Sequence, residues 1–143
     1  MGLAKRIIAR LDIKTGMLIK SVKFDGQRKI GNPEEFALKY SENNIDEIFL
    51  VNNTGSLFNT TLDSKIVKNI RSKVTMPIAG GGGINSTSEV ERLIKSGCDK
   101  IILNTSIFKQ THLISELSKE FGSQCIVGSF DLRRKENSYQ FFI

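Results

Sequence analysis

The sequence has few of the residues that build metal centres and disulfide frameworks. Its 143 residues include two cysteines and one histidine. Cys98 and Cys125 lie in or beside apolar runs without the spacing of metal ligands, so we expect buried, reduced thiols rather than a disulfide. His112 stands at the start of an expected helix with no cysteine or carboxylate cluster around it, so we expect a solvated side chain. No metal site is predicted.

Long apolar runs and dense basic clusters are also missing. No run approaches the roughly 20 residues that a membrane-spanning helix needs, and the N-terminus leads into a strand-like segment without a small-residue cleavage site. We therefore expect a cytoplasmic protein with no membrane partner. The net charge is +6, but the basic residues are scattered and no aromatic residues alternate with them, which argues against a nucleic-acid partner. A basic balance also suits a site for phosphorylated small molecules.

Strand and helix signals alternate along the chain. Hydrophobic residues make up 39% and charged residues 25%, which is typical of a globular domain with a real core. The predicted strands are near-continuous apolar runs, as in a parallel sheet that helices cover. They lie at 7–11, 48–51, 77–79, 101–103 and 125–130.

Capping signals mark the helices between these strands. Asn32-Pro33-Glu34-Glu35 combines an N-cap, a proline in the first turn and a glutamate able to reach back. Ser86-Thr87-Ser88-Glu89 is a capping box, and Gly97 and Gly122 each close a helix. Two further helices are expected over 62–70 and 113–121. The basic segment after residue 12 is predicted to be a long loop with a small hairpin at 18–24.

Repeated βα units favour a barrel. No Gly-x-Gly-x-x-Gly turn follows the first strand, so a dinucleotide-binding sheet is disfavoured and no cofactor is expected. A (βα)8 barrel usually takes about 250 residues and eight strands. The predicted fold is therefore α/β: the N-terminal half plus the fifth strand of a (βα)8 TIM barrel, in one domain over 1–143. We expect a truncated barrel, or one that closes its sheet with a partner copy, and an extended apolar tail at 138–143.

Polar residues or glycines follow every predicted strand. Active residues of such barrels lie at the carboxyl ends of the strands. Helix capping explains some of these residues, but a binding site explains the whole set better. In order, the strand ends are Asp12, Asn52-Asn53, the run Gly80-Gly81-Gly82-Gly83, Asn104-Thr105 and Asp131.

The glycine run predicts a phosphate site. It lies between a strand and a capped helix, where backbone N–H groups can approach an anion without obstruction by a Cβ. A glycine-rich turn alone could equally be a plain loop. Asn104 and Thr105 at the next strand end add an amide and a hydroxyl for the same anion.

Two aspartates are candidates for acid–base chemistry. Asp12 and Asp131 are expected on opposite sides of the barrel opening, where two carboxylates can divide the roles of general acid and general base. For each, a loop cap is the structural alternative. Lys20 in the basic segment could fold over an anionic substrate, and its alternative is a solvated lysine.

Over its whole length the chain resembles the cyclase (synthase) subunit of imidazole glycerol phosphate synthase. The order and spacing of the shared motifs carry this resemblance, since no single motif decides it. These motifs are Ala4-Lys5-Arg6-Ile7-Ile8 before Leu11-Asp12, Gly31-Asn32-Pro33, Asp46-Glu47, Gly81-Gly82-Gly83-Ile84, Gly97-Cys98-Asp99-Lys100, Asn104-Thr105 and Phe121-Gly122-Ser123-Gln124-Cys125.

The resemblance implies a (βα)8 barrel that works with a glutaminase subunit. Ammonia would cross the barrel to a phosphorylated ribulosyl intermediate, giving imidazole glycerol phosphate and an aminoimidazole carboxamide nucleotide. The chain would then be a lyase of the glutamine amidotransferase type in histidine biosynthesis.

The resemblance also assigns residues. It implies that Asp12 and Asp131 are catalytic. It places the first phosphate at Gly83, Asn104 and Thr105, with Gly82 beside them and Lys20 as the loop lysine. It implies a charged ammonia gate at the bottom of the barrel. The gate would be formed by Arg6, Glu47 and Lys100, with a fourth member, a glutamate, beyond Ile143.

Three departures from the family pattern keep other readings open. The family has a cysteine where this chain has Arg10, and an aspartate where it has Asn52. Its second phosphate site lies in the half that is not present here. Arg10, the segment 19–24 and Val127-Gly128-Ser129 are closer to paralogues found with surface-polysaccharide genes, which are thought to pass ammonia to a nucleotide-activated sugar. A third hypothesis is a non-catalytic half-barrel that docks a glutaminase or binds phosphate.

Overall fold

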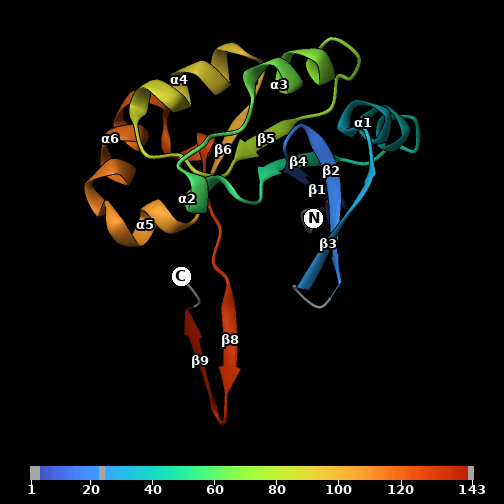
Figure 1. The fold of residues 1–143 in the computed structure, drawn as a ribbon. Helices are drawn as coiled ribbons and strands as arrows, with labels where there is room; N and C mark the ends of the chain where they lie inside the picture. The colour runs from blue at the N-terminus through green and yellow to red at the C-terminus, as the bar shows by residue number, and fades with distance from the viewer. Residues whose placement is uncertain (1–3, 23–24, 142–143) are drawn as a thin grey trace.

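Five parallel strands and two antiparallel strands at one side of them form a seven-stranded sheet, most of which can be followed in Figure 1. The computed structural model describes residues 4–22 and 25–141. β1 (Ile8–Lys14) lies beside β4 (Glu47–Asn52), followed by β5 (Ile78–Gly81), β6 (Lys100–Leu103) and β7 (Ile126–Gly128), each parallel to the next. The predicted parallel α/β sheet is confirmed.

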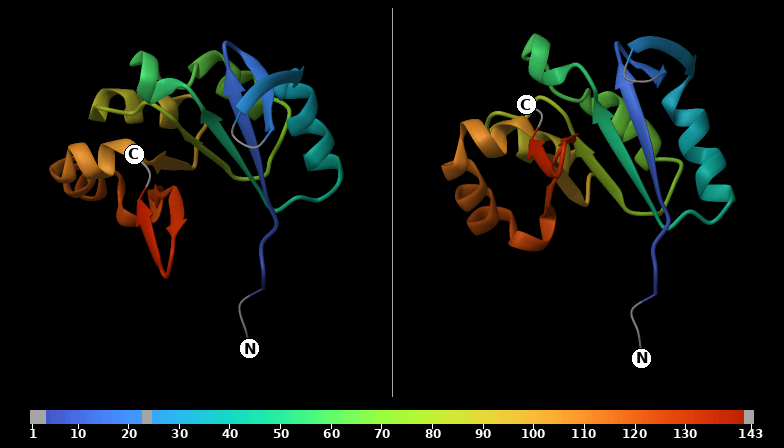
Figure 2. Two further views of the ribbon diagram at one scale, coloured as in Figure 1. Left: turned by 60° about the horizontal axis from the view of Figure 1, so that its bottom comes forward. Right: turned by 90° about the horizontal axis from the view of Figure 1, so that it is seen from below.

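The longer helices cover one side of this sheet (Figures 1 and 2). Right-handed βα crossovers place successive helices on the same side, and α1 contacts α3, α3 contacts α4, and α4 contacts α6. The short helices α2 and α5 each directly follow a strand end. The bounds are α1 (Pro33–Glu42), α2 (Gly55–Phe58), α3 (Ser64–Arg71), α4 (Thr87–Lys95), α5 (Thr105–Lys109) and α6 (Thr111–Phe121), with a 3₁₀ turn at Ser123–Cys125.

The core lies between these helices and the sheet. Strand residues such as Leu11, Ile48 and Ile101 are almost completely buried there, together with Val67 and Leu93 of the helices. Each side chain of this size stabilises the fold by about 1.5–3 kcal/mol when it is fully buried. In the part of the chain that the structure describes, no helix is both long and apolar enough to cross a membrane.

The first strand is longer than predicted. A strand ending at residue 11, followed by a long loop, is wrong: β1 continues through Asp12 to Lys14 and turns directly into β2 (Met17–Val22). Thr15 and Gly16 form the turn, both with positive φ, as two-residue hairpin turns require. β3 (Asp25–Gly31) pairs with β2. Residues 23–24 of the predicted hairpin at 18–24 lie outside the described residues.

The C-terminal part also differs from prediction. The expected strand at 125–130 is reduced to β7, so Asp131 follows the end of its strand by three residues. Residues 138–141 of the expected extended tail are half of a hairpin, since β9 (Ser138–Phe141) pairs with β8 (Leu132–Lys135) in a separate two-stranded sheet. Residues 142–143 of that tail lie outside the described residues. The turn between them brings Glu136 to a φ of 52°.

A polar clasp joins α1 to α3. Asn32 caps α1 by accepting a hydrogen bond from the N–H of Glu34, but neither Glu34 nor Glu35 has a hydrogen bond back to the cap among the described residues, so the predicted reach-back is wrong. The Glu34 carboxylate lies toward α3. It accepts hydrogen bonds from Lys73 Nζ at 2.7 Å and Asn69 Nδ2 at 2.7 Å instead. These two donors hold the pKa of the Glu34 carboxyl below its ordinary value.

A Glu34→Gln variant tests this clasp. A depressed pKa means that the clasp stabilises the fold above the ordinary glutamate pKa and loses this effect as pH falls. We expect Glu34→Gln to lower the free energy of unfolding by roughly 0.2–1 kcal/mol at neutral pH, as for an exposed ion pair, and by less at about pH 3. Urea unfolding at both pH values measures this. Glu35→Gln is the control, because Glu35 is exposed and has no ion pair among the described residues; an equal loss in both variants would contradict the clasp.

Candidate functional site

The carboxyl ends of the central strands surround a cavity of about 360 Å³. Gly82 and Gly83, which follow β5, line it together with Asn104 and Thr105 after β6 and Asp131 after β7. Five of the residues that the sequence assigns to these strand ends therefore meet at one cavity, whereas Gly80 and Gly81 lie within β5. Other residues of its lining are Arg10, Asn52, Asn53, Asn59, Asn85, Lys109 and Ser129.

Glycine is required at the turn after β5. Gly82 and Gly83 have φ of 100° and 72°, which side chains with a Cβ rarely adopt. A Cβ on Gly82 would collide with the backbone of Asn52, and one on Gly83 would collide with the carbonyl oxygen of Thr60 and with Gly55. The turn thus packs directly on the loop that follows β4, and it leaves backbone groups at the cavity free of side-chain obstruction.

Asn104 forms a hydrogen bond with Asp131 at the cavity. Its Nδ2 donates a hydrogen bond of 2.8 Å to Asp131 Oδ2. Although Asn104 is the N-cap of α5, its side chain makes no capping hydrogen bond. The capping alternative therefore fails for this residue, and its amide orients a carboxylate at the cavity instead.

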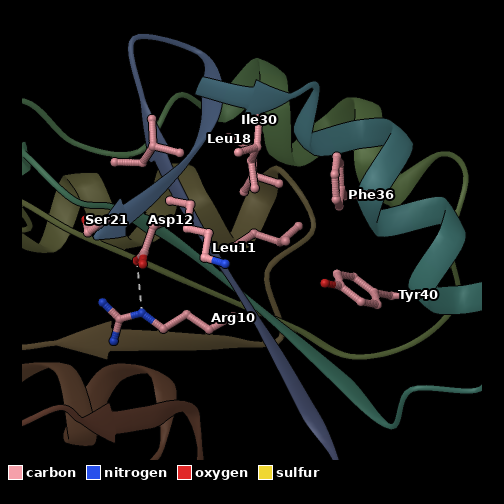
Figure 3. A pocket seen from close by; sticks show the side chains of 10 residues that line it. Arg10, Leu11, Asp12, Leu18, Ser21, Ile30, Phe36 and Tyr40 are labelled. Carbon is pink, nitrogen blue, oxygen red and sulfur yellow. Dashed lines mark hydrogen bonds and ion pairs between the residues drawn. The ribbon is translucent and has the colours of Figure 1, made fainter. Parts of the chain in front are cut away.

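Asp12 lies apart from this cavity. It is inside β1 rather than at a strand end, and its Oδ1 accepts a hydrogen bond of 2.9 Å from Arg10 Nε (Figure 3). It lines a second cavity of about 280 Å³ with Lys20 and Ser21 of β2. Arg10 lines both cavities, so the structure places Asp12 and Asp131 on two neighbouring cavities that share this guanidinium. Lys20 is exposed.

A charged group lies at the opposite end of the strands. Glu47 begins β4 and Lys100 begins β6, and Lys100 Nζ donates to both carboxylate oxygens of Glu47, at 2.7 and 2.9 Å. The Glu47 side chain is 3% exposed. Arg6, before β1, lies 3.9 Å from the same carboxylate and is itself exposed. The three residues that the resemblance groups as a gate are thus adjacent.

The Asn52 side chain forms hydrogen bonds with the loop that follows β4. Its Nδ2 lies 3.2 Å from the carbonyl oxygens of Thr60 and Thr61, and its Oδ1 accepts from the N–H of Thr54. These bonds hold the loop against which the glycine turn packs. Two other lining residues, Lys109 and Ser129, were not assigned a role in the site from the sequence. Lys109 ends α5, a short helix without a capping signal in the sequence. Ser129 follows β7, which is shorter than the predicted strand.

An aromatic cluster joins the C-terminal hairpin to the body of the protein. Phe108 of α5 contacts Phe130, with ring centroids 5.9 Å apart, and Phe141 of β9, with centroids 5.1 Å apart; Phe130 and Phe141 are 5.7 Å apart. Phe130 directly precedes Asp131, and its ring lies over Gly128. The cluster therefore fixes the segment that carries Asp131.

The thiols and the histidine lie away from the cavity. Cys98 is buried, which raises its thiol pKa to about 12, and Cys125 is half-buried; both are free, so burial was predicted correctly only for Cys98. His112 is exposed, as expected. Among residues 4–22 and 25–141, no three His, Cys, Asp or Glu side chains are grouped to hold a metal ion.

Comparison with known proteins assigns the chain to a family. A family model described as "Histidine biosynthesis protein" matches residues 6–142. The chain belongs to this histidine biosynthesis protein family. Its members are TIM barrels, so the five parallel strands with outer helices are a partial barrel.

Curated relatives within this family bear the name imidazole glycerol phosphate synthase subunit HisF. The protein from Campylobacter concisus is 41% identical over 140 residues, 98% of this chain and 56% of the relative. Those from Helicobacter hepaticus and Legionella pneumophila are 41% and 42% identical, over 100% and 92% of this chain and 57% and 62% of their own lengths. The chain thus spans little more than half the length of these relatives.

A Gly83→Ala variant tests the glycine turn of this family member. Gly16 is the matched control, because its φ of 77° is close to the 72° of Gly83 but a Cβ there meets nothing within 4 Å. Gly16→Ala is expected to cost about 1–2 kcal/mol of unfolding free energy from backbone strain alone. Gly83→Ala is expected to cost at least about 2 kcal/mol more, since backbone must also move. Urea unfolding measures both, and equal costs would refute the close packing.

A Phe108→Ala variant tests the aromatic cluster. It removes two of the three ring pairs, each worth about 0.5–1.5 kcal/mol, so undocking of the hairpin should become roughly tenfold more frequent. Limited trypsin digestion measures this as faster cleavage at Arg133, Arg134 and Lys135. Phe58→Ala is the control, because Phe58 is 67% exposed and outside the cluster. Unchanged cleavage in Phe108→Ala would show that the rings do not hold the hairpin.

Proposed function

We propose that this chain carries the ammonia-using cyclase chemistry of imidazole glycerol phosphate synthase, in histidine biosynthesis. The observation that carries the proposal is the cavity of about 360 Å³ at the strand ends, which gathers the glycine turn, Asn104, Thr105 and Asp131. Relatives with the printed name of this synthase subunit are about 40% identical across nearly the whole chain. The substrate would be a phosphorylated ribulosyl aminoimidazole carboxamide nucleotide.

The glycine turn is proposed to hold one phosphate of this substrate. Gly82 and Gly83 line the cavity and are proposed to donate backbone N–H groups to the anion, and the Thr105 hydroxyl, which lines the same cavity, can donate to it as well. Lys20 on β2, beside the Asp12 cavity, is the cation proposed to approach the substrate from the opposite side. The proposal assigns a single phosphate grip to these residues.

Asp131 and Asp12 are proposed to move protons during ring closure. Both carboxylates lie at cavities, and each has one oxygen in a hydrogen bond, to Asn104 or to Arg10. An oriented carboxylate next to a bound substrate can act as general acid or base. The Asn104 amide holds Asp131 in place without adding a charge beside it, which suits Asp131 to this role.

The proposed ammonia source is a glutaminase subunit bound at the opposite end of the strands. The Glu47–Lys100 pair, of which Glu47 is buried, and Arg6 lie at the amino ends of the strands, away from the proposed phosphate cavity. A neutral molecule that entered there would pass along the strands to reach Asp131. The Glu47–Lys100 ion pair is proposed to separate when ammonia enters. This role gives a physical reason for an ion pair at this position.

A second candidate is a paralogue that passes ammonia to an activated sugar. Two observations favour it. Arg10 donates a hydrogen bond to the Asp12 carboxylate, and the Asn52 amide donates one to the loop after β4. The gate residues would serve both routes, so they do not separate the two. Rescue of a histidine auxotroph by the intact gene would decide for the histidine pathway.

Turnover with free ammonium tests the cyclase directly. The phosphorylated ribulosyl substrate and an ammonium salt are mixed with the protein, and imidazole glycerol phosphate is measured. Asp131→Asn is expected to reduce turnover by at least about 100-fold, as for loss of a general acid or base. Asp63→Asn is the control, because Asp63 caps α3 through its side chain and asparagine caps equally well.

The possible results separate the candidates. Turnover that depends on Asp131 supports the cyclase. If the folded protein binds a glutaminase but forms no product, a docking half-barrel replaces the cyclase. If ammonium is instead incorporated into a nucleotide-activated sugar, the second candidate is correct.

A further inference from the structure

Among the residues that the structure describes, Arg10 alone lines both cavities at the site. It lines the cavity of about 360 Å³ with the glycine turn and Asp131, and the cavity of about 280 Å³ with Asp12 and Lys20. Its position in β1 explains this, because side chains alternate along a strand: Leu11 and Ile13 point into the core under the helices, whereas Arg10 and Asp12 point to the other face. A cation therefore stands between the two carboxylates.

The guanidinium of Arg10 has most of its donors to spare. Of its five N–H groups, only the one on Nε is used, at 2.9 Å from Asp12 Oδ1; the terminal nitrogens make no hydrogen bond within residues 4–22 and 25–141. The side chain is 46% exposed, and that of Asp12 is 32% exposed. Figure 3 shows the guanidinium and the Asp12 carboxylate facing each other at the cavity. The Nε–H and the adjacent terminal N–H point to the same side and can bind a carboxylate or phosphate through two parallel hydrogen bonds, and Asp12 uses only the first of them.

The charges around the cavities favour an anion at this position. Arg10 and Lys109 line the larger cavity against one carboxylate, Asp131, which already accepts a hydrogen bond from Asn104. Arg10 and Lys20 line the smaller cavity against Asp12 alone. Each cavity therefore has one more cation than anion among its lining residues.

The bond between Arg10 and Asp12 is weak enough to exchange. The two residues are partly exposed neighbours on one strand, and ion pairs of that kind contribute about 0–1 kcal/mol. A ligand oxyanion that binds the guanidinium through two hydrogen bonds, with the glycine turn holding another part of the same ligand, can compete with this pair. Asp12 would then lose its partner when the ligand arrives.

We propose that Arg10 binds a second oxyanion group of the substrate, a phosphate or a carboxylate, and that this group displaces Asp12 from the guanidinium. The consequence is a substrate that completes its own site: binding at Arg10 frees the Asp12 carboxylate for proton transfer. The exchange involves hydrogen bonds only, and no covalent bond forms or breaks. Only the use of the freed Asp12 rests on the proposed function; binding at Arg10 does not.

A double-mutant cycle with inorganic phosphate tests the exchange. Phosphate is titrated into wild-type protein, Arg10→Met, Asp12→Asn and the double variant, and the Nε–H signal of Arg10 is followed by NMR, assigned by its absence in Arg10→Met. Asp12→Asn is expected to raise phosphate affinity at this signal about threefold to fivefold, because the internal competitor is gone. Calorimetry should show one weak phosphate site fewer in Arg10→Met, and Asp12→Asn should change nothing in that background.

Two further variants make the result specific. Arg10→Lys keeps the charge but loses the fork, so its affinity for phosphate is expected to fall between those of wild type and Arg10→Met. Thr105→Val weakens the phosphate site at the glycine turn and is expected to leave the Arg10 Nε–H response to phosphate in place. Acetate titrated in the same way shows whether a carboxylate is accepted as well as a phosphate.

The proposal fails if phosphate and acetate both leave the Arg10 Nε–H signal unmoved, or if Asp12→Asn raises affinity equally with and without Arg10. Circular dichroism of every variant identifies any that does not fold, and Arg10→Lys alone then carries the comparison with wild type. These measurements need no turnover. Failure of the cyclase assay with an intact phosphate response would reject the proposed function and keep the anion site, whereas the reverse pattern would reject only the anion site.

Discussion

Packing of the helices against one side of the sheet is the constraint on which the site depends. It divides each strand into side chains that the helices bury and side chains that they do not. In β1, Leu11 and Ile13 are buried, which forces Arg10 and Asp12 to the opposite face. That face is where polar groups can stand close together without losing contact with water. The acid–base candidates therefore owe their position to the apolar residues beside them.

Close backbone packing places the glycine turn after β5. Gly82 lies so close to the backbone of Asn52, and Gly83 so close to that of Thr60, that neither position has room for a Cβ. Asn52 in turn holds Thr60 and Thr61 through its amide. The turn after β5 is thus shaped by the loop after β4, and the two strand ends form one structure. A substitution in either loop is expected to act on both.

The sequence indicates the parallel strands and longer helices well, because local signals agree with the packing there. Apolar runs coincide with β4, β5 and β6, and the caps at Asn32 and Ser86 begin α1 and α4 where expected. It indicates β1 poorly, because the polar Asp12 resembles a strand end although Ile13 continues the alternation of the strand. The C-terminal hairpin was missed because contacts that are distant in sequence, Phe108 with Phe141, hold it.

The site residues, too, are predictable where local signals place them and not where distant contacts do. The glycine turn, Asn104, Thr105 and Asp131 could be placed at one edge of the sheet because parallel strands end together. The hydrogen-bond partners of these side chains could not be predicted, because the bond from Asn104 to Asp131 depends on how far Asp131 lies beyond β7. The pairing of Arg10 with Asp12 was open to prediction once both are placed in one strand, two residues apart.

The two carboxylates are controlled by different parts of the molecule. Asp131 is held by a neutral amide and by a segment that the aromatic cluster docks, so its position depends on the hairpin. Asp12 is fixed by β1 and occupied by a cation, so its freedom depends on what else that cation binds. A reaction that needs both groups therefore needs a docked hairpin and an anion at Arg10 together. Neither condition requires movement of the sheet, which allows the rigid part of the fold to stay unchanged while the site is completed.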